Sequence, residues 1–594
     1  MLGIPDRTSH NPFHTVDIAA TTAWLTKLNQ ALEQLDEQGI AHLFDEDCHW
    51  RDLLAFTWSI TPTEGTRNIA ALMTQHQRHA KARGFKLAEG RLDPRRIKRT
   101  GVEVIESIIQ FETELGRCFG VLRLPVSNPK KAFQLLTSLD ELKGHEEKIG
   151  ARRPTGSAYS RNFGGTNWLD QRIASEAYAD RDPTVLVIGG GQSGLSVAAS
   201  LVLLGIDTLV IDKYPRIGDS WRKRYHSLAL HNVTDLNHLP YLPFPESWPS
   251  YLPKDMVGNW LEVYAQTMEI NNWTNTQLSQ ARYDEQNKRW SATLKNADGS
   301  ERTLQPKHII FANGLVGLPR IPKLPGLEAF KGDVMHTSAF TSGAQWHGKK
   351  ALVLGTGTSA HDVAQDLHSN GVDTTMIQRG STTVVSIDPS LKLTYALYEG
   401  ISLDDGDLLS STNTLPVTKR NFKQTTERMV ELDKKLIAGL IERGFKWDKG
   451  EDDTGYQMKI RTRYGGYYLN AGCSDLIISG DIGLTQYDQI EKFIETGAQM
   501  KDGSVLHADL IVMATGFVPQ EVVIKELLGS ETADKIGSIW GIDADGEMRN
   551  MWRRTAQPGL WFVGGSFTNC RIYSKYVAMQ IKAIEEKLTP MLTS

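Results

Sequence analysis

The chain has 594 residues, too many for one hydrophobic core, so we expect two to four domains. Its formal net charge of −4 lacks the electrostatic footprint of a nucleic-acid-binding protein. No apolar run is long enough to span a bilayer, and the first residues do not have the pattern of a signal peptide. The four cysteines lie far apart, without metal-site spacing or a disulfide framework. We therefore expect a cytoplasmic protein without a metal site, a membrane span or a nucleic-acid partner.

Residues 1–145 have a helical pattern followed by a β-rich one. Leucines at spacings of three and four predict a helix over 20–43, and a shorter helix is expected near 68–81. Three β-rich runs follow, the first two joined as a hairpin: 102–114, 117–125 and 132–142. This order predicts a small α+β domain.

The stretch 50–58, W-R-D-L-L-A-F-T-W, gives this domain a resemblance to the cone-shaped domain of the nuclear transport factor 2-like and SnoaL-like proteins. Five side chains here either line a pocket or form an aromatic core with one buried Arg–Asp pair: His49, Trp50, Arg51, Asp52 and Trp58. We favour the core, because no nucleophile is paired with a base. The domain is expected to support a homodimer or to shape the entrance to the main site.

A polar segment separates this domain from the rest of the chain. Residues 146–181 are rich in glycine and arginine, which is typical of a linker. A short helix is expected within it, over 168–179. We assign no chemistry to this segment.

The most specific motif of the chain is a dinucleotide-binding fingerprint. A buried parallel strand is predicted over 185–188, and a G-x-G-x-x-G sequence follows directly, with Gln192 and Ser193 between its last two glycines: Gly189, Gly191 and Gly194. The glycines permit a tight turn, a close approach of pyrophosphate and close packing of the next helix. A second apolar strand then leads to Asp212, placed to hydrogen-bond a ribose hydroxyl.

The segment after Asp212 resembles the flavin-containing monooxygenases. Residues 217–225 contain a glycine followed by Trp221, similar to the G-G-x-W segment of that family, although Asp219 replaces the second glycine. The resemblance implies that Lys213 and Trp221 bind FAD. It also implies that Asn232 acts catalytically beside the reacting edge of the flavin, whereas an asparagine in a turn is otherwise only a turn residue.

Two further motifs continue the resemblance. A buried strand over 308–311 is followed by Ala312-Asn313-Gly314, where the family commonly has A-T-G and where Gly314 is expected at the cofactor. Residues 330–340 then match F-x-G-x-x-x-H-x-x-x-[F/Y], the fingerprint of class B flavin monooxygenases. The resemblance implies that His336 positions the hinge between two nucleotide domains. The related Baeyer–Villiger enzymes usually have Trp where this chain has Phe340.

A second glycine fingerprint lies within residues 351–360. After its strand come Gly355, Gly357, Thr358 and Ser359, with Ala360 in place of the third glycine, an accepted variant. The next strand, over 374–377, ends in Gln378-Arg379 without an acid. Because Arg379 offers a bidentate partner for a 2′-phosphate, which a carboxylate would repel, we predict NADPH over NADH.

The remaining segments complete two nucleotide folds. A helix near 419–443 and a Gly/Tyr-rich run at 464–472 predict a helical insertion over the active site, where substrate choice is expected. A strand over 508–513 ends in A-T-G, with Thr515 and Gly516 at the cofactor, and there we expect the chain to return to the first domain. A last strand leads to Gly564, and a helix over 573–586 closes the FAD domain.

The predicted fold class is α/β, with two Rossmann-like dinucleotide-binding domains, the NADP domain inserted in the FAD domain, preceded by a small α+β cone-like domain. The boundaries we predict are as follows: an α+β domain at 1–145, a linker at 146–181, a FAD domain at 182–320 and 510–594, and an NADP domain at 321–509 with a helical insertion at about 385–480.

The resemblance to class B flavin monooxygenases covers residues 182–594 and implies the cofactors FAD and NADPH. It implies hydride transfer from NADPH to FAD, formation of a C4a-(hydro)peroxyflavin with O2, and insertion of one oxygen atom into a small organic substrate. A nucleophilic N or S is the favoured target, as in N,N-dimethylaniline monooxygenases.

Other functions stay open. A flavin disulfide reductase is disfavoured, because it needs a pair of nearby cysteines. A Baeyer–Villiger monooxygenase is an alternative. So is an oxidative decarboxylating indole-3-pyruvate monooxygenase, because the segment FPESWPSYLP at 244–253 resembles that branch. From another class, the chain would be a binding or scaffold protein with a vestigial flavin site.

Overall fold

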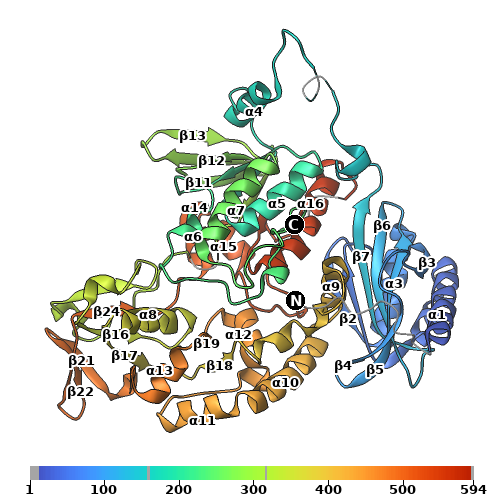
Figure 1. The fold of residues 1–594 in the computed structure, drawn as a ribbon. Coiled ribbons are helices and arrows are strands. Elements are labelled where there is room, and N and C mark those ends of the chain that lie inside the picture. The colour runs from blue at the N-terminus through green and yellow to red at the C-terminus, as the bar shows by residue number, and fades with distance from the viewer. Residues whose placement is uncertain (1–12, 157–158, 160, 315–316, 590–594) are drawn as a thin grey trace.

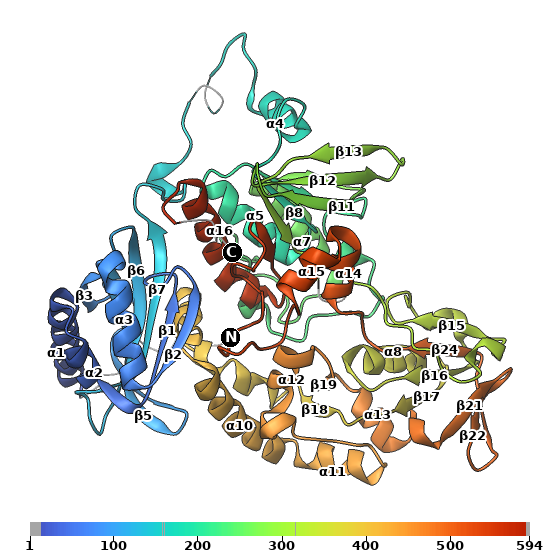
Figure 2. The same cartoon turned by 180° about the vertical axis from the view of Figure 1, so that it is seen from behind.

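The computed structural model describes residues 13–156, 159, 161–314 and 317–589. An N-terminal α+β unit lies on one side, and two parallel sheets lie one above the other on the other side (Figures 1 and 2). The last helix, α16 (Phe567–Glu585), lies between the N-terminal unit and the upper sheet.

The N-terminal unit combines helices with a curved, mainly antiparallel sheet. The helix expected over 20–43 is interrupted, because Leu35 adopts a left-handed conformation and Asp36 caps a new helix by accepting from the N–H of Gly39. The strand order is β2-β1-β7-β6-β5-β3, with β4 paired to β5. The bounds are α1 (His14–Gln34), α2 (Glu37–His42), β1 (Phe44–Leu53), β2 (Ile60–Glu64), α3 (Thr66–Ala80), β3 (Arg83–Leu87), β4 (Arg95–Arg99), β5 (Val102–Glu112), β6 (Gly116–Pro125) and β7 (Ala132–Leu142).

The first parallel sheet has the order β10-β9-β8-β14-β25, so the strand before the first glycine turn is central. Successive strands spread to both sides of β8, which is the Rossmann arrangement. Helices α5 and α16 pack against one another beside this sheet. The bounds are α4 (Trp168–Ala177) in the linker, β8 (Val185–Ile188), α5 (Gln192–Leu203), β9 (Thr208–Ile211), α6 (Asp219–Arg222), α7 (Lys254–Thr267), β10 (Asn271–Trp273), β11 (Thr276–Asp284), β12 (Arg289–Asn296), β13 (Glu301–Leu304), β14 (His308–Phe311) and β25 (Leu560–Phe562).

The second parallel sheet has the order β15-β24-β16-β17-β20. Its central strand β16 leads into the second glycine turn, and β24 pairs with it on one side. The bounds are β15 (Asp333–His336), β16 (Lys350–Leu354), α8 (Thr358–Ser369), β17 (Asp373–Gln378), α13 (Cys473–Ser479), β20 (Gly483–Gln486), β21 (Ile490–Ile494), β22 (Gly497–Met500), β23 (Val505–His507), β24 (Leu510–Met513), α14 (Gln520–Leu528) and α15 (Ser530–Ile536).

The strand before A-T-G differs from the sequence expectation. The sequence places it where the chain re-enters the first domain at 510, but β24 lies within the second sheet, between β15 and β16. The chain therefore re-enters the first sheet only at β25. Buried parallel strands in either sheet have the same apolar pattern, so the pattern of Leu510–Met513 cannot tell the two sheets apart.

The helical insertion lies beside the second sheet and reaches the N-terminal unit (Figure 1). The expected helix over 419–443 is two helices that meet at Asp433. The bounds are β18 (Thr383–Ser386), α9 (Leu403–Ser410), α10 (Leu415–Leu432), α11 (Lys434–Glu442), α12 (Gly455–Arg463) and β19 (Tyr467–Asn470).

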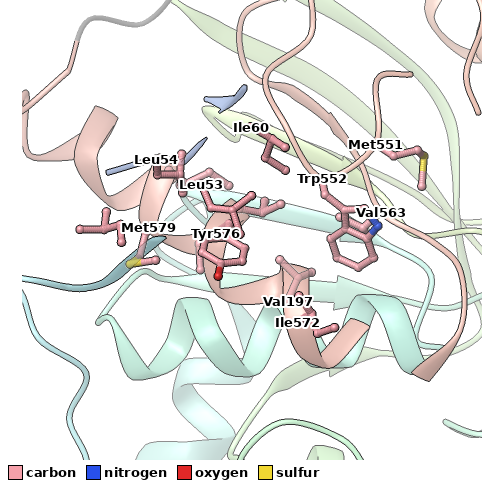
Figure 3. Close-up of a cluster of buried hydrophobic side chains, with 14 of the residues drawn as sticks. Leu53, Leu54, Ile60, Val197, Met551, Trp552, Val563, Ile572, Tyr576 and Met579 are labelled. Atoms are coloured by element: carbon pink, nitrogen blue, oxygen red, sulfur yellow. The ribbon is translucent and has the colours of Figure 1, made fainter. Parts of the chain in front are cut away.

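The N-terminal unit packs against α16 through an apolar cluster and buried polar contacts. Figure 3 shows Leu53, Leu54 and Ile60 beside Tyr576 and Met579 of α16. The expected Arg51–Asp52 pair is not formed: Arg51 instead holds both carboxylate oxygens of Glu547, at 2.7 Å each. Adjacent strand residues point to opposite faces, so the Arg51 and Asp52 side chains cannot meet. Asp52 accepts from the hydroxyls of Thr57 and Thr137.

Candidate functional site

The first glycine turn lies at the carboxyl end of β8, where backbone is tightly packed. Gly189 has a φ of +113°, and a Cβ there would lie 2.6 Å from the carbonyl oxygen of Ala312. A Cβ at Gly194 would lie 1.9 Å from the oxygen of Gly189, so α5 packs directly on the turn. At Gly191, by contrast, the nearest atom to a Cβ would be Ser220 Oγ at 3.9 Å. The space beside Gly191 thus matches the close approach of a pyrophosphate.

Asp212 organises this turn from the end of β9. Its carboxylate accepts from the backbone N–H of Gly190 at 2.7 Å and of Tyr214 at 2.8 Å. Burial raises its pKa, and the two N–H groups oppose that effect. Each carboxylate oxygen keeps a second lone pair, so Asp212 can hold the turn and accept from a ribose hydroxyl together.

The other residues predicted for the first site gather around this turn. Gln192 accepts from the indole N–H of Trp221 at 3.1 Å and donates to the carbonyl of Gly565, next to Gly564. Ser193 Oγ lies 3.2 Å from Cys570 Sγ of α16. Lys213 is exposed beside Tyr214, and the carbonyl of Gly314 accepts from Gln520 at 2.8 Å.

The second glycine turn repeats the geometry of the first. Gly355 has a φ of +126°, and a Cβ there would lie 2.6 Å from the oxygen of Ala514. Ala514 begins the A-T-G turn, as Ala312 begins the A-N-G turn, so each fingerprint packs on its own alanine carbonyl. A Cβ at Gly357 would meet only Tyr467 O, at 3.9 Å. The remaining predicted residues begin α8: Thr358, which donates to Tyr467 O, the partly buried Ser359 and the buried Ala360.

Arg379 follows β17 and is exposed at the same edge of the sheet as the second turn. In the described part of the chain, no carboxylate lies within 4 Å of its guanidinium. A free guanidinium at this edge suits a 2′-phosphate.

His336 joins the class B fingerprint to the A-T-G turn. Its Nε2 lies 2.9 Å from the oxygen of Gly516, and its ring packs edge-on against Phe517 at 5.1 Å. Burial lowers the pKa of His336, so the neutral ring that donates to a carbonyl is favoured. Thr515 donates to Arg320 O in the segment that connects the two sheets. These contacts suit a positioning role at the hinge.

Asn232 is contacted by the helical insertion. Its Oδ1 accepts from the hydroxyl of Tyr395, which lies in the turn before α9. Tyr395 in turn lies in a cluster of tyrosines, and burial raises its pKa well above the usual value. No sequence pattern points to Tyr395.

Further polar groups near the two turns lack protein partners. Ser220 Oγ, beside Gly191, and His361 Nε2, in the first turn of α8, are buried without a hydrogen-bond partner among the described residues. Together with the open space at Gly191 and Gly357, the orphaned Ser220 Oγ fits a bound dinucleotide, whereas the His361 ring is stacked on Tyr468 in the protein interior. A buried serine and histidine have no distinguishing sequence pattern, so sequence reasoning missed both.

Two negative findings concern residues 13–156, 159, 161–314 and 317–589. Within them, His, Cys, Asp and Glu side chains form no group of three that would hold a metal ion. No helix there combines the length and apolarity that crossing a membrane requires.

Sequence comparisons give matches over the two nucleotide-binding sheets. A family model described as flavin-binding monooxygenase-like matches residues 182–537. The indole-3-pyruvate monooxygenase YUCCA1 of Oryza sativa subsp. japonica is 30% identical over 351 residues, which cover 59% of this chain and 80% of that protein. The probable indole-3-pyruvate monooxygenase YUCCA4 of Arabidopsis thaliana is 27% identical, over 56% of this chain and 75% of that protein.

Structure comparisons match a similar share of the chain. A flavin-containing monooxygenase from Stenotrophomonas maltophilia has a TM-score of 0.47 and 18% identity, covering 69% of this chain and 100% of that one. Cyclohexanone monooxygenase from Rhodococcus sp. Phi1, bound to NADP⁺, has a TM-score of 0.46 and 17% identity, covering 68% and 84%.

Proposed function

The chain belongs to the flavin-binding monooxygenase-like family and is a flavin-dependent monooxygenase, and we propose that it oxidises an aromatic 2-oxo acid with FAD, NADPH and O2. The observation that carries this substrate class is the similarity to indole-3-pyruvate monooxygenases, which extends over 80% of the rice protein. The segment FPESWPSYLP at 244–253 resembles that same branch and supports the assignment.

The proposed reaction balances with the family's own reactants. One atom of O2 enters the product acid and the other leaves in water. The bond between the carboxylate carbon and the keto carbon breaks, and the carboxylate carbon leaves as CO2. NADPH and one proton supply the two reducing equivalents, so NADP⁺ is the fourth product.

The chain's own residues hold the cofactors in place. FAD, when bound, supplies hydride acceptance from NADPH and activation of O2. Gly191 and the N-terminus of α5 are suited to its pyrophosphate, and Asp212 to its ribose. Gly357 and Arg379 are suited to the pyrophosphate and 2′-phosphate of NADPH. His336 ties the linker between the sheets to the A-T-G turn, so we assign it a positioning role.

Asn232 is the residue we assign to the reacting edge of the flavin. Its Oδ1 already accepts from Tyr395, which leaves its amide N–H groups free to donate. The tyrosine therefore fixes the orientation of the amide.

Oxygenation of a nucleophilic N or S is a second candidate. Phe340, where Baeyer–Villiger enzymes usually have Trp, is buried and stacked on Trp346 at 6.1 Å. This residue favours the flavin-containing monooxygenases proper over the Baeyer–Villiger type.

For the N-terminal unit we propose a nuclear transport factor 2-like fold that supports the catalytic part. Its strands β1, β2 and β7 dock on α16 of the same chain, so these strands are not available to a second copy. An intramolecular role is therefore favoured over a homodimer formed through them.

Purified protein would be tested for bound FAD by its absorbance, and for NADPH-dependent O2 consumption with indole-3-pyruvate, thioanisole and cyclohexanone. With ¹⁸O2 and indole-3-pyruvate we expect one labelled oxygen in the product acid and one CO2 per NADPH. Oxidation of thioanisole without any turnover of 2-oxo acids would overturn the substrate class and leave the second candidate. Protein that binds no FAD would overturn the function as a whole.

A further inference from the structure

Helix α12 and its C-terminal cap carry three polar side chains that the family motifs do not explain. Gln457 and Arg461 lie four residues apart on one face of the helix, and Tyr464 follows its last residue in a left-handed conformation. In both views α12 lies below α16, next to α10 and β19 (Figures 1 and 2).

Two of these side chains have polar groups without a hydrogen-bond partner among the described residues. Gln457 is only 7% exposed and donates to Thr394 Oγ1, but its Oε1 is buried without a partner in the described part of the chain. Arg461 forms neither a hydrogen bond nor an ion pair with any described residue. Its guanidinium carbon lies 5.5 Å from the ring centroid of Phe422. The exposed guanidinium of Arg461, which no carboxylate of the described residues pairs, is open to an anionic ligand.

The charge of Arg461 is uncompensated because its neighbour is already paired. Arg51 donates to both carboxylate oxygens of Glu547, and Glu547 is the carboxylate whose charge acts on Arg461. Burial lowers the pKa of Arg461, and the positive charge of Arg51 lowers it further, although the side chain is exposed to solvent. The lowered pKa and the solvent exposure are both expected for a side chain that is surrounded by protein but still in contact with solvent. Such a cation favours an anion as its ligand.

Hydrogen bonds connect α12 to the neighbourhood of Asn232. Tyr464 is 40% exposed, and its ring packs edge-on against Trp540 at 5.4 Å. Burial raises the pKa of Tyr464, and the charges of Arg224 and Cys570 also act on it. Cys570 lies in the first turn of α16, beside Ser193 of the first fingerprint. Thr394, the partner of Gln457, directly precedes Tyr395, which holds Asn232.

We propose that Arg461 binds the carboxylate of the substrate, with Tyr464 and Trp540 against its aromatic ring. A guanidinium gives a carboxylate two parallel hydrogen bonds, and aromatic side chains give the ring a matching surface. The inference rests on the proposed function, since it takes the substrate to be an aromatic acid. Arg461 acts in binding, so its loss affects KM more than kcat.

The test compares Arg461→Met, Arg461→Lys and the control Arg463→Met in the FAD-loaded enzyme. Arg463 lies two residues further on, on the other side of α12, and its substitution makes the same change in net charge. Phenylpyruvate serves as the substrate. The paired inhibitors 3-phenylpropanoate and 3-phenylpropanamide differ only in the carboxylate.

We expect Arg461→Met to raise the KM for phenylpyruvate and the inhibition constant of 3-phenylpropanoate by about 10- to 100-fold. The kcat, the KM for NADPH and the inhibition constant of the amide should stay within about twofold, since only the carboxylate contact is lost. Arg461→Lys should fall between the wild type and Arg461→Met, because lysine keeps the charge but not the paired geometry. Arg463→Met should behave as the wild type.

The outcomes separate this inference from the proposed function. If Arg461→Met leaves the KM for phenylpyruvate and the inhibition constant of 3-phenylpropanoate unchanged, Arg461 does not bind the carboxylate, even if phenylpyruvate is a substrate. Equal losses in Arg461→Met and Arg463→Met would also overturn this role, and so would a wild type that 3-phenylpropanoate does not inhibit. If phenylpyruvate is not oxidised but 3-phenylpropanoate inhibits through Arg461, the role of Arg461 in carboxylate binding stands and the substrate assignment fails.

Discussion

Gly355 and Gly357 lie two residues apart in the second glycine turn, yet the structure gives them different tolerances. At Gly355 the positive φ and the nearby Ala514 carbonyl exclude a side chain. Gly357 has a φ of −83°, and the space beside it is open. The first glycine is required by the fold, and the second by whatever occupies that space.

We expect Gly357→Ala to keep the melting temperature and to raise the KM for NADPH by roughly 10- to 100-fold, because a Cβ would hold the phosphate away from the backbone N–H groups. Gly355→Ala should lower the melting temperature as well. Steady-state kinetics and thermal melts check both variants. A Gly357→Ala enzyme with the wild-type KM for NADPH would contradict the placement of the phosphate.

His361 gives the second nucleotide-binding sheet a specific pH dependence. Its ring stacks on Tyr468 at 3.8 Å, also packs near Phe445, and its Nδ1 lies 3.1 Å from Gly357 O. Burial lowers its pKa to about 4. As the pH falls below about 6.5, the unfolded chain gains a proton at this position while the folded chain does not.

The free energy of unfolding should therefore fall as the pH decreases from about 6.5 to about 4, by up to about 3 kcal/mol through His361 alone. His361→Gln should remove this part of the slope, because glutamine does not titrate. Urea unfolding of both proteins between pH 4.5 and 7.5 measures the difference. If the free energy of unfolding falls equally with decreasing pH in the variant and the wild type, the folded protein does not hold the His361 imidazole neutral.

At the level of single residues, the glycines and Asp212 could be located from the sequence, because glycines at this spacing between a strand and a helix rarely occur outside dinucleotide sites. The same reasoning failed for Arg51, which was expected to pair with Asp52 and instead reaches Glu547. Partners nearly 500 positions apart leave no local pattern. The same reason hides Tyr395 and Arg461, whose roles depend on which helix lies opposite them.

Among the elements, β1 is joined by the buried ion pair Arg51–Glu547 to the segment that precedes β25, and the N-terminal unit also contacts α16 through apolar side chains. Burial alone would lower the pKa of Arg51, but the Glu547 carboxylate outweighs it and raises the pKa. The exposed pair Lys575–Asp140 joins the same two units, with both side chains about a third exposed or more. Because the Arg51–Glu547 pair is buried and the Lys575–Asp140 pair is exposed, we expect breaking the first to lower the free energy of unfolding more than breaking the second.

We expect Glu547→Gln to lower the free energy of unfolding by about 3 kcal/mol, since it leaves the Arg51 charge buried without a counter-charge. Asp140→Asn should cost less than about 1 kcal/mol, because its pair is screened by water. Urea unfolding at two salt concentrations measures both. Similar small losses for the two variants would mean that Arg51 finds another partner.

Element boundaries were predicted well where local chemistry sets them. The strand β7 spans the predicted residues 132–142, and β8, β9 and α4 were also located. The strand β24 was assigned to the wrong sheet, because the choice between two parallel sheets depends on tertiary contacts. The break between α1 and α2 was missed, since the leucine periodicity continues through it.

For the whole molecule, the docking of the N-terminal unit on α16 predicts the result of removing that unit. A chain of residues 182–594 would expose Tyr576 and Met579 on α16, which are buried in the full chain. We expect it to aggregate or to associate on size-exclusion chromatography, because uncovered apolar surface promotes association. A monodisperse truncated chain with full turnover would contradict a supporting role for the unit.

The overall plan of two nucleotide folds could be predicted because each begins with a fingerprint that needs its strand, turn and helix in order. The position of the N-terminal unit could not be predicted. Its contacts with α16 and with α9 are made by surfaces that have ordinary β-sheet and helix patterns. Only the assembled structure brings them together.

The pairing of the first strands with the last helix has a consequence for synthesis on the ribosome. The N-terminal unit emerges before α16, which follows it only after both parallel sheets have been translated. At about 5–20 residues per second, Leu53 and Ile60 stay uncovered for tens of seconds to about two minutes. During that interval the nascent chain depends on chaperones or on its own charge to stay apart from its neighbours.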